Sequence, residues 1–139
     1  MILIADSGSS KCDWAFFDSE NNQLKIIKTI GFNPYFISPE KIIKEFNKST
    51  DLCRISKNIK SLFFYGAGCS GDSKIYILKK VLNGFFINAK VFIEHDLLGA
   101  CRSIINNKNS INCIIGTGSI ACLYDGKVIK LSVPSLGYV

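Results

Sequence analysis

The fold of this chain is decided by its first turn, in the segment Ile2-Leu3-Ile4-Ala5-Asp6-Ser7-Gly8-Ser9-Ser10-Lys11. The apolar residues at its start predict a buried strand, and the glycine and serines after Asp6 predict a tight turn. Residues 12–18 then alternate between apolar and polar side chains, which is typical of a returning strand. The motif is therefore a hairpin, unlike the P-loop, in which the strand leads into a helix. Backbone N–H groups in such a turn bind phosphate oxygens, and a carboxylate beside them can hold Mg²⁺ through water.

A second glycine turn of the same kind lies near the other end of the sequence. Residues 111–115 predict another buried strand, which runs into Gly116-Thr117-Gly118-Ser119, and residues 120–124 predict its return. Two such strand–turn–strand units are what an internal duplication would produce. If the two turns face each other across a cleft, they could hold a polyphosphate from both sides.

The residues around and between the two turns predict three strands and then alternating helices and strands. The opening strands, at 2–6, 12–18 and 24–30, form a meander. Ser38 caps a helix that starts with Pro39, and Asp72 or Ser73 caps a second helix, which Gly84 ends. The remaining predicted elements are strands at 61–65 and 90–94 and a helix at 96–106. The resulting order, βββαβαβα, is that of an α/β domain of the ribonuclease-H-like class, with a mixed sheet.

A polar, turn-rich segment at residues 106–110 predicts a boundary between two lobes. We assign residues 1–107 to an N-terminal ribonuclease-H-like lobe and residues 108–139 to the first strands of an incomplete second lobe. Three strands without their helices leave one face and one edge of a sheet uncovered. The expectation is therefore a truncated protein that holds only part of a functional site.

The composition of the chain bounds its class. Its 139 residues suit one compact core, and no apolar run reaches the roughly 18 residues that cross a membrane. The start lacks the basic segment of a signal peptide, so we expect a soluble cytoplasmic protein with no membrane partner. None of the six cysteines forms a C-x-x-C pair, and we expect reduced, mostly buried thiols.

The charge pattern argues against a nucleic-acid partner. The formal net charge is +6, but only Arg54 and Arg102 are arginines, and the lysines are dispersed along the chain. Nucleic-acid surfaces usually gather basic residues, arginine above all, into one patch. We therefore expect no nucleic-acid binding.

Six blocks of sequence, in order, make the chain resemble one family. It looks like the N-terminal half of the N-acetylglucosamine kinase-like proteins of the BadF/BadG/BcrA/BcrD ATPase family, within the actin, sugar-kinase and Hsp70 superfamily. The blocks are Asp6-Ser7-Gly8-Ser9-Ser10-Lys11-Cys12-Asp13-Trp14, Gly31-Phe32-Asn33-Pro34, Tyr65-Gly66-Ala67-Gly68-Cys69, Asp96-Leu97-Leu98-Gly99-Ala100, Gly116-Thr117-Gly118-Ser119 and Pro134-Ser135-Leu136-Gly137-Tyr138. The resemblance implies the actin-like ATPase version of the ribonuclease-H-like fold.

The resemblance also implies an activity, cofactors and partners. The family member would be an ATP-dependent kinase that phosphorylates the 6-hydroxyl of N-acetylglucosamine, with ATP and Mg²⁺ as cofactors. Its partners would be a small amino sugar and either a second copy of the chain or a complementing C-terminal fragment. In the family the adenosine-binding residues lie on the second lobe, so the chain by itself is expected to be inactive.

Roles for individual residues follow from the same resemblance. Asp96 would be the general base that accepts the hydroxyl proton, and Asp6 would hold Mg²⁺ through water. The phosphate-binding residues would be Gly8, Ser9, Ser10, Lys11, Gly116, Thr117 and Gly118, and the substrate-binding residues Asn33, Asp96 and Ser119. Two positions depart from the family's usual pattern: Ser10 stands where threonine is common, and Ile120 stands where asparagine is usual.

Several of these roles have a structural alternative. Asp6 could be a turn acid bonded to its own loop, and Asp96 could serve only as a helix N-cap. Asn33 could shape the turn before a proline, and Lys11 could be a solvated lysine. His95 lies between two acids, but neighbours on a strand point to opposite faces, so we assign it no role in a metal site.

Three other functions remain open. Gly66-Ala67-Gly68-Cys69-Ser70-Gly71 fits the G-x-G-x-x-G dinucleotide pattern, with Glu94 ending the next strand, although a three-stranded meander precedes it. An ATPase of the BadF/BadG type would activate a partner enzyme, but the scattered cysteines offer no ligand set for an iron–sulfur cluster. The third is a non-catalytic remnant that binds sugar or nothing.

Overall fold

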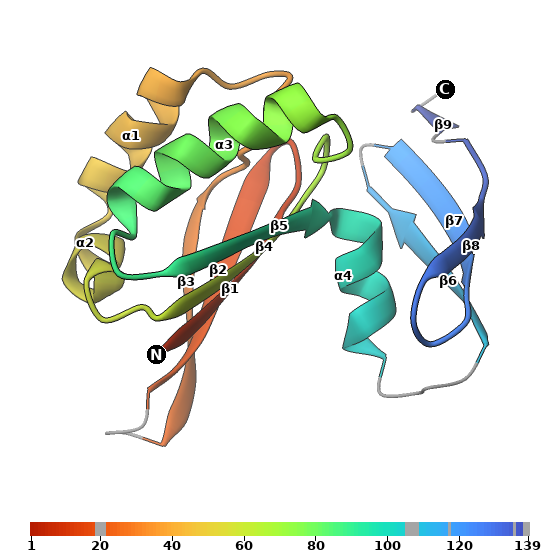
Figure 1. The fold of residues 1–139 in the computed structure, drawn as a ribbon, viewed down its shortest axis with the longest axis horizontal. Helices are drawn as coiled ribbons and strands as arrows, with labels where there is room; N and C mark the ends of the chain where they lie inside the picture. The colour runs from red at the N-terminus through yellow and green to blue at the C-terminus, as the bar shows by residue number, and fades with distance from the viewer. Residues whose placement is uncertain (19–21, 105–108, 117, 135, 138–139) are drawn as a thin grey trace.

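The computed structural model describes the chain except for residues 19–21, 105–108, 117, 135 and 138–139, and except for the side chains of 136–137. Its first part is a five-stranded mixed sheet in the order β3-β2-β1-β4-β5 (Figure 1). The strands are β1 (Ile2–Ser7), β2 (Lys11–Asp18), β3 (Gln23–Ile30), β4 (Ser61–Gly66) and β5 (Lys90–His95). The hairpin partners are antiparallel, whereas β4 runs parallel to both β1 and β5. The predicted mixed sheet is confirmed.

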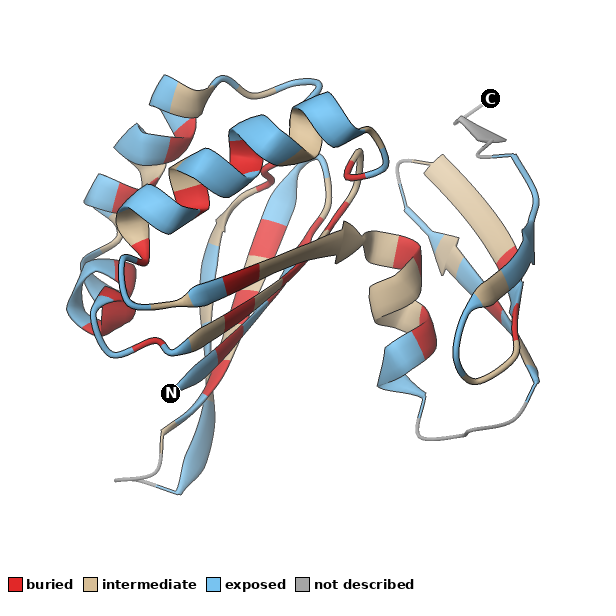
Figure 2. Cartoon of the chain, viewed as in Figure 1, coloured by how far each residue is buried: buried red, intermediate tan, exposed pale blue. Residues whose placement is uncertain are grey.

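Three helices cover one face of this sheet, as Figure 1 shows: α1 (Pro39–Lys48), α2 (Thr50–Ser56) and α3 (Asp72–Phe85). The core between the layers centres on Trp14, which is fully buried and whose indole N–H donates to Thr29 Oγ1 at 2.9 Å. The rings around Trp14 are those of Phe32, Phe46, Phe64 and Phe86. In Figure 2, buried positions, in red, lie on the sheet and on the helices that cover it. This aromatic core holds β1 and its turn in place.

The helices differ from the sequence prediction in three details. Ser38 caps α1 as predicted, but the short helix α2, capped by Ser49, was not predicted. The prediction that Asp72 or Ser73 caps α3 is wrong, because Gly71 is the N-cap and no side chain bonds to the first turn. Gly84 does not end α3 either, since the helix continues to Phe85 and the buried Phe86 turns the chain into the core.

The last helix of the first part, α4 (Asp96–Ser103), leads toward a second sheet. The helix is shorter than the predicted span of 96–106, because its C-cap is Ile104. The second sheet has the order β6-β7-β8, and β9 also pairs with β7. Its strands are β6 (Ser110–Ile115), β7 (Gly118–Tyr124), β8 (Ile129–Ser132) and β9 (Leu136–Gly137). The three predicted strands of this region are present, and β9 is an addition.

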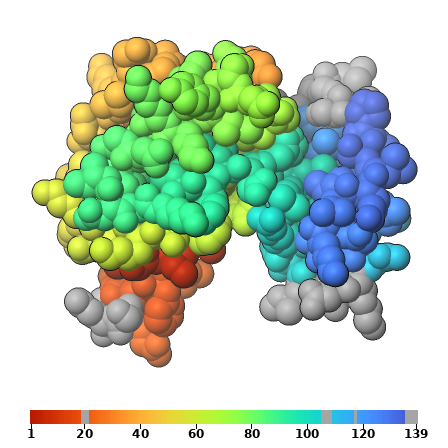
Figure 3. All heavy atoms as spheres, in the orientation of Figure 1, coloured from red at the N-terminus to blue at the C-terminus, as the bar shows by residue number. Residues whose placement is uncertain are grey.

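One side of α4 is buried against the second sheet. Leu97 and Cys101 form a small core with Cys122 and Tyr124, separate from the core around Trp14. Figure 3 shows α4 between the first part of the molecule and the second sheet. The other face of the second sheet is open, and the exposed fractions of Ile111 and Ile115 are 77% and 87%. Among the described residues, no helix is both long and apolar enough to cross a bilayer.

Candidate active site

A cleft of about 840 Å³ opens between the β1–β2 turn, α4 and the end of β6. Its walls contain Asp6, Gly8, Ser9, Ser10 and Lys11 from the hairpin, Asp96, Gly99, Ala100, Arg102 and Ser103 from α4, and Ile114, Ile115 and Gly116 from the second sheet. Ile4 and Tyr65 complete the lining. Two other hollows lie around α1 and α3 and share no lining residue with this cleft. The first predicted turn, both candidate catalytic acids and the start of the second turn therefore share one cleft.

The β1–β2 turn is held from behind by the segment that follows β3. Within the turn, the N–H of Gly8 donates to the carbonyl of Lys11 at 2.9 Å. Behind it, the buried Ser7 accepts a hydrogen bond on Oγ from the N–H of Phe32 at 2.9 Å. A Cβ on Gly31 would overlap the backbone of Gly8 and Ser9, so only glycine permits this close approach. The turn is thus a supported element of the fold.

Asn33 belongs to this support and lies outside the cleft lining. Its Nδ2 donates to Ser9 Oγ at 3.0 Å, and its Oδ1 accepts from the N–H of Tyr35 at 3.0 Å. The side chain is buried, with 7% exposed. The turn-shaping alternative for Asn33 has direct geometric support, whereas its role in sugar binding stays a prediction.

Asp6 lies directly opposite Asp13 in the register of β1 and β2, so both carboxylates project from the same face of the sheet. Partial burial raises the pKa of Asp6, the charges of Asp96 and Asp13 raise it further, and Lys11 lowers it. Lys11 Nζ lies 3.4 Å from Asp13 Oδ2. The other oxygen, Asp13 Oδ1, is buried without a hydrogen-bond partner among the described residues. The site therefore gathers negative charge that the protein's own cations only partly balance.

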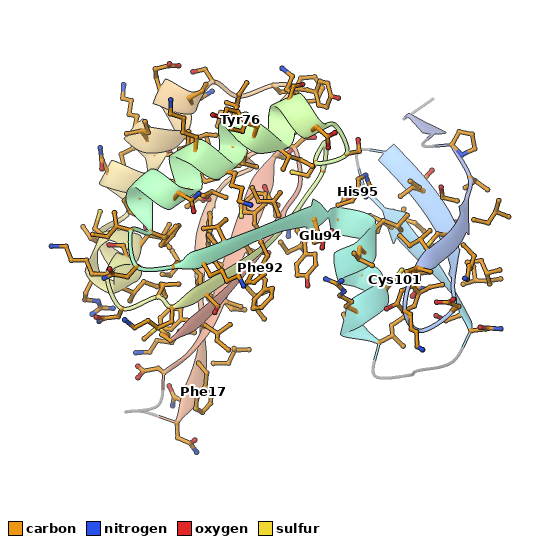
Figure 4. All side chains as sticks on the ribbon, viewed as in Figure 1. Phe17, Tyr76, Phe92, Glu94, His95 and Cys101 are labelled. Carbon is orange, nitrogen blue, oxygen red and sulfur yellow. The ribbon has the colours of Figure 1, made fainter. Side chains whose placement is uncertain are left out.

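Asp96 is the first residue of α4 and projects into the cleft where β5 ends. Its Oδ1 accepts a hydrogen bond from the N–H of Leu97 at 2.8 Å. The residue that caps the helix is His95, whose Nδ1 lies 3.2 Å from the same N–H and 2.8 Å from Asp96 Oδ1. Figure 4 shows His95 and Glu94 at this junction between β5 and α4. The N-cap alternative for Asp96 is thus wrong by one position, because His95 occupies the cap.

Among the described residues of the second turn, Gly116 lines the cleft, whereas Gly118 and Ser119 do not. Gly116 lines the cleft and donates its N–H to the carbonyl of Gly118 at 2.9 Å. Thr117 lies outside the described residues. Ser119 pairs with Ile115 inside the second sheet and does not line the cleft. Ile120 is half-buried and packs against the small core of α4 and β7, which explains an apolar residue at this position.

The glycine-rich loop between β4 and α3 is filled by protein side chains. A Cβ on Gly66 would collide with Phe64 and Cys69, and a Cβ on Gly68 would collide with Asn33 and Tyr35. Gly68 has a φ of +77°, the left-handed conformation that glycine adopts without strain. The space beside these glycines is filled by side chains of the protein itself, so the glycines are needed for packing. This argues against a dinucleotide bound at this loop.

Three residues that the sequence analysis missed shape the cleft. Arg102 Nη1 donates to the hydroxyl of Tyr65 at 3.2 Å, and its guanidinium lies over that ring, 5.9 Å from the centroid. Gly99 lets α4 approach β4, because a Cβ there would overlap Tyr65. Asp96, Gly99 and Arg102 recur every three positions and therefore lie close to one face of a helix. This spacing could have indicated that α4 forms one wall of the cleft.

The comparisons with known proteins agree with the fold. No family model and no curated protein matches the chain. A solved structure named "Putative N-acetylglucosamine Kinase", from Porphyromonas gingivalis, is 36% identical with a TM-score of 0.82 over 96% of this chain and 47% of that protein. The ethanolamine utilization protein EutJ from Carboxydothermus hydrogenoformans is 10% identical with a TM-score of 0.63, over 97% of this chain and 51% of EutJ. A PPX-GPPA enzyme from Aquifex aeolicus is 12% identical with a TM-score of 0.50, over 98% of this chain and 52% of that enzyme.

These similarities establish the fold as that of the actin-like ATPases, as the sequence predicted. EutJ and the Aquifex aeolicus enzyme are too distant in sequence to indicate more than the fold. The Porphyromonas gingivalis protein is much closer in sequence, at 36% identity. This chain spans about half the length of that protein, since the alignment covers 47% of it.

Proposed function

We propose that this chain supplies the phosphate-binding turns and the general base of an ATP-dependent sugar kinase of the BadF/BadG/BcrA/BcrD family. The observation that carries the proposal is the single cleft in which the Gly8–Lys11 turn, Asp6, Asp96 and Gly116 meet. Phosphoryl transfer needs hydrogen-bond donors for the phosphate oxygens and a base for the incoming hydroxyl, and this cleft offers both. The sequence identity of 36% to the Porphyromonas gingivalis protein supports the same function.

The proposed reaction begins when the sugar hydroxyl attacks the γ-phosphorus of ATP. A new O–P bond forms while the bond from phosphorus to the β,γ-bridging oxygen breaks, and ADP leaves with that electron pair. Asp96 accepts the hydroxyl proton, because its carboxylate lines the cleft at the start of α4. The backbone of the first turn, the hydroxyls of Ser9 and Ser10 and the ammonium of Lys11 stabilise the charge on the phosphoryl oxygens.

The carboxylates of Asp6 and Asp13 suit a divalent cation. They face each other across β1 and β2, and the charge of Asp13 contributes to the raised pKa of Asp6. Asp13 Oδ1 is buried without a hydrogen-bond partner among the described residues. A hard cation with oxygen ligands would relieve both the repulsion and the unpaired oxygen. Asp6 would hold Mg²⁺ through water, and the bound ion would neutralise charge on the phosphates.

An amino sugar is the proposed substrate, and the 6-hydroxyl of N-acetylglucosamine the proposed acceptor. The name of the Porphyromonas gingivalis protein supports this choice. Of the three predicted sugar contacts, only Asp96 lines the cleft, so the sugar would lie along α4 beside Tyr65 and Arg102. Adenosine would be held by the part of such a kinase that this chain does not span, on a second lobe or a complementing fragment. The proposed location is the cytoplasm, where ATP is supplied.

The test measures sugar binding and turnover on the same preparation. The ¹⁵N-labelled chain is titrated with N-acetylglucosamine and Mg²⁺-ATP while backbone amide shifts are followed, and ATP consumption is measured in a coupled assay. Asp96→Asn keeps the size of the side chain but removes the base. We expect sugar to shift the amides of α4 and phosphates to shift those of the first turn, and any sugar-dependent turnover to fall by about 10²–10⁴-fold in the variant.

Each outcome decides between functions. Sugar-dependent turnover that Asp96→Asn abolishes would establish a kinase. Amide shifts without turnover would indicate a binding half-site that needs a second lobe. Turnover of ATP that does not depend on sugar would favour the ATPase alternative. A folded chain whose amides respond to neither ligand would refute the kinase proposal and leave a non-catalytic remnant.

A further inference from the structure

The imidazole of His95 lies against the carboxylate of Asp96, at the entrance to α4. His95 Nδ1 is 2.8 Å from Asp96 Oδ1, and the N–H of Leu97 is 2.8 Å from the same oxygen. The exposed fractions of the two side chains are 34% for His95 and 19% for Asp96. Both groups are therefore partly shielded from water, where a hydrogen bond between them is stronger than at an open surface.

The position of the imidazole proton follows from these distances. If Nδ1 carried no proton, its lone pair would face the lone pairs of Asp96 Oδ1 at 2.8 Å, which is repulsive. The N–H of Leu97 does not require Nδ1 as an acceptor, because Asp96 Oδ1 is closer to it, at 2.8 Å against 3.2 Å. A proton on Nδ1, donated to Asp96, satisfies all three groups at once. His95 is therefore assigned the Nδ1–H form.

This assignment distinguishes the two oxygens of the carboxylate. Oδ1 receives two donors, the N–H of Leu97 and Nδ1–H of His95. Oδ2 accepts no hydrogen bond from any described residue, while Asp96 lines the cleft. A carboxylate that is held through one oxygen presents the other in a defined direction.

We propose that His95 is a positioning residue that holds Oδ1 of Asp96 through Nδ1–H, so that Oδ2 is the oxygen that accepts the proton of the substrate hydroxyl. The inference rests on the proposed kinase function. It assigns a role to the only histidine of the chain and a specific atom to the base. A histidine at the cap of α4 suits this role, because a neutral imidazole keeps one N–H, which can be carried by Nδ1.

The carboxylate beside His95 favours the same assignment. Asp96 raises the pKa of His95, through the hydrogen bond first and also through its charge, while partial burial lowers it. The charge of Asp96 also raises the pKa of Asp6, so a second acid lies near this pair. Because the pKa of His95 is higher in the folded protein, its contact with Asp96 stabilises the fold most at low pH. This extra stabilisation is lost as the pH rises through the raised pKa. Above it, the neutral Nδ1–H form still donates to Asp96.

The tautomer can be read directly by nuclear magnetic resonance. Long-range ¹H–¹⁵N spectra of the ¹⁵N-labelled chain contain the signals of one imidazole, because the sequence has one histidine. We expect the Nδ1–H tautomer in the neutral form, together with a raised pKa. In Asp96→Asn the pKa should fall, and the tautomer should shift toward Nε2–H. Glu94→Gln is the matched control, because it removes the other neighbouring carboxylate and should change neither.

Two results of this experiment would overturn the inference. One is an Nε2–H tautomer in the wild-type protein at neutral pH. The other is a His95 pKa that stays the same in Asp96→Asn while the amide spectrum shows that the variant is folded. Both results are independent of ATP and sugar, so they separate the fate of this inference from that of the proposed kinase.

Turnover supplies the second arm. His95→Ala removes the donor, whereas His95→Asn keeps a cap and an amide N–H near the position of Nδ1. We expect kcat to fall on the order of 10–100-fold in His95→Ala with little change in KM, and to recover in part in His95→Asn. Equal kcat values for wild type and His95→Ala would refute the positioning role and leave the kinase standing. If the wild type binds sugar without turnover, the chain is a half-site, and the spectra alone decide whether His95 Nδ1–H holds Asp96.

Discussion

The amide of Asn33 donates a hydrogen bond from Nδ2 to Oγ of Ser9 at 3.0 Å. This contact joins the segment after β3 to the turn between β1 and β2, which is separated from it by the whole second and third strands. The same side chain accepts from the N–H of Tyr35, so one buried amide orders two loops. The shape of the first phosphate turn therefore depends on a residue that does not line the cleft.

Asn33→Ala should loosen the first turn without removing any group from the cleft. The loss of two hydrogen bonds at a buried amide should lower the free energy of unfolding by about 1–3 kcal/mol. Chemical denaturation measures this loss, and a titration with Mg²⁺-ATP should show weaker shifts in the amides of Gly8 to Lys11. The control is Asn47→Ala, at an exposed position of α1. Equal stability of the Asn33 variant and wild type would contradict the supporting role.

Replacing Gly31 and Gly84 by alanine should change the stability of the protein in opposite directions. At Gly31 a Cβ would overlap the backbone of Gly8 and Ser9, so Gly31→Ala should destabilise the protein by about 1–3 kcal/mol and displace the turn. At Gly84, inside α3, a Cβ would meet nothing within 4 Å, so Gly84→Ala should stabilise it by about 0.5–1 kcal/mol. Thermal unfolding of the pair checks both signs. A stabilising effect of alanine at Gly31 would mean that the turn and the β3 segment do not touch.

In the absence of ligands, the ionised carboxylate of Asp6 should lower the stability of the folded protein at neutral pH. The pKa of Asp6 is raised in the folded protein, so folding is favoured while this carboxyl is protonated, below the ordinary pKa of an aspartate. That stabilisation is lost as the pH rises through the raised pKa and the carboxyl ionises. Asp6→Asn, which is neutral at every pH, should therefore raise Tm at pH 7, and the difference should vanish below about pH 3. Mg²⁺ should raise Tm of the wild type more than that of the variant.

Thermal scans across this pH range test the prediction on Asp6, with Asp51→Asn as the control. Asp51 lies in the first turn of α2, pairs with Arg54 at 3.1 Å and does not line the cleft. Its replacement should not raise Tm at any pH. A lower Tm of Asp6→Asn at pH 7 would show that Asp6 is a stabilising turn acid, which is the structural alternative.

The six cysteines should divide into two classes of reactivity. Cys53 and Cys113 are exposed, whereas Cys12, Cys69, Cys101 and Cys122 are buried. Burial raises the pKa of Cys69 to about 12 and that of Cys101 to about 12, so neither forms a thiolate at neutral pH. Brief treatment with iodoacetamide, followed by mass spectrometry, should therefore label Cys53 and Cys113 and leave the other four until the protein is unfolded. Rapid labelling of Cys101 would indicate that α4 separates from β7.

Most of the strands were predictable because their signal is local. The apolar runs of β1, β4 and β5, and the glycines that end or follow β1 and β4, determine strand and turn over a few residues, without reference to the rest of the chain. The helix ends were less predictable. Gly84 is compatible with a helix end by its type, but the helix continues because Phe86 enters the core one turn beyond Leu82. The packing of Phe86 against Trp14 and Phe46, which are distant in the sequence, decided that boundary.

The role of His95 illustrates a different limit. In the sequence it stands between two acids, which suggested a metal site that strand geometry then made implausible. The chain bends from β5 into α4 at this residue, and the bend brings the imidazole to the carboxylate of Asp96. The side chains of neighbouring residues can meet at such a junction, because the strand, whose side chains point alternately to opposite faces, ends there.

The sequence by itself determined the two glycine turns, the acids beside them and the order of elements of a ribonuclease-H-like domain, and its six family-like blocks indicated the actin-like ATPase version of that fold. These features depend on residue types at short spacing, which bias the backbone locally. Only the tertiary structure decided that the first turn, Asp96 and Gly116 share one cleft, and that Asn33 supports the turn instead of lining it. The reason is that these contacts follow from the register of β1 with its neighbours and from the burial of α4 against the second sheet. Both are set by packing between segments far apart in the chain, where no local pattern carries the information.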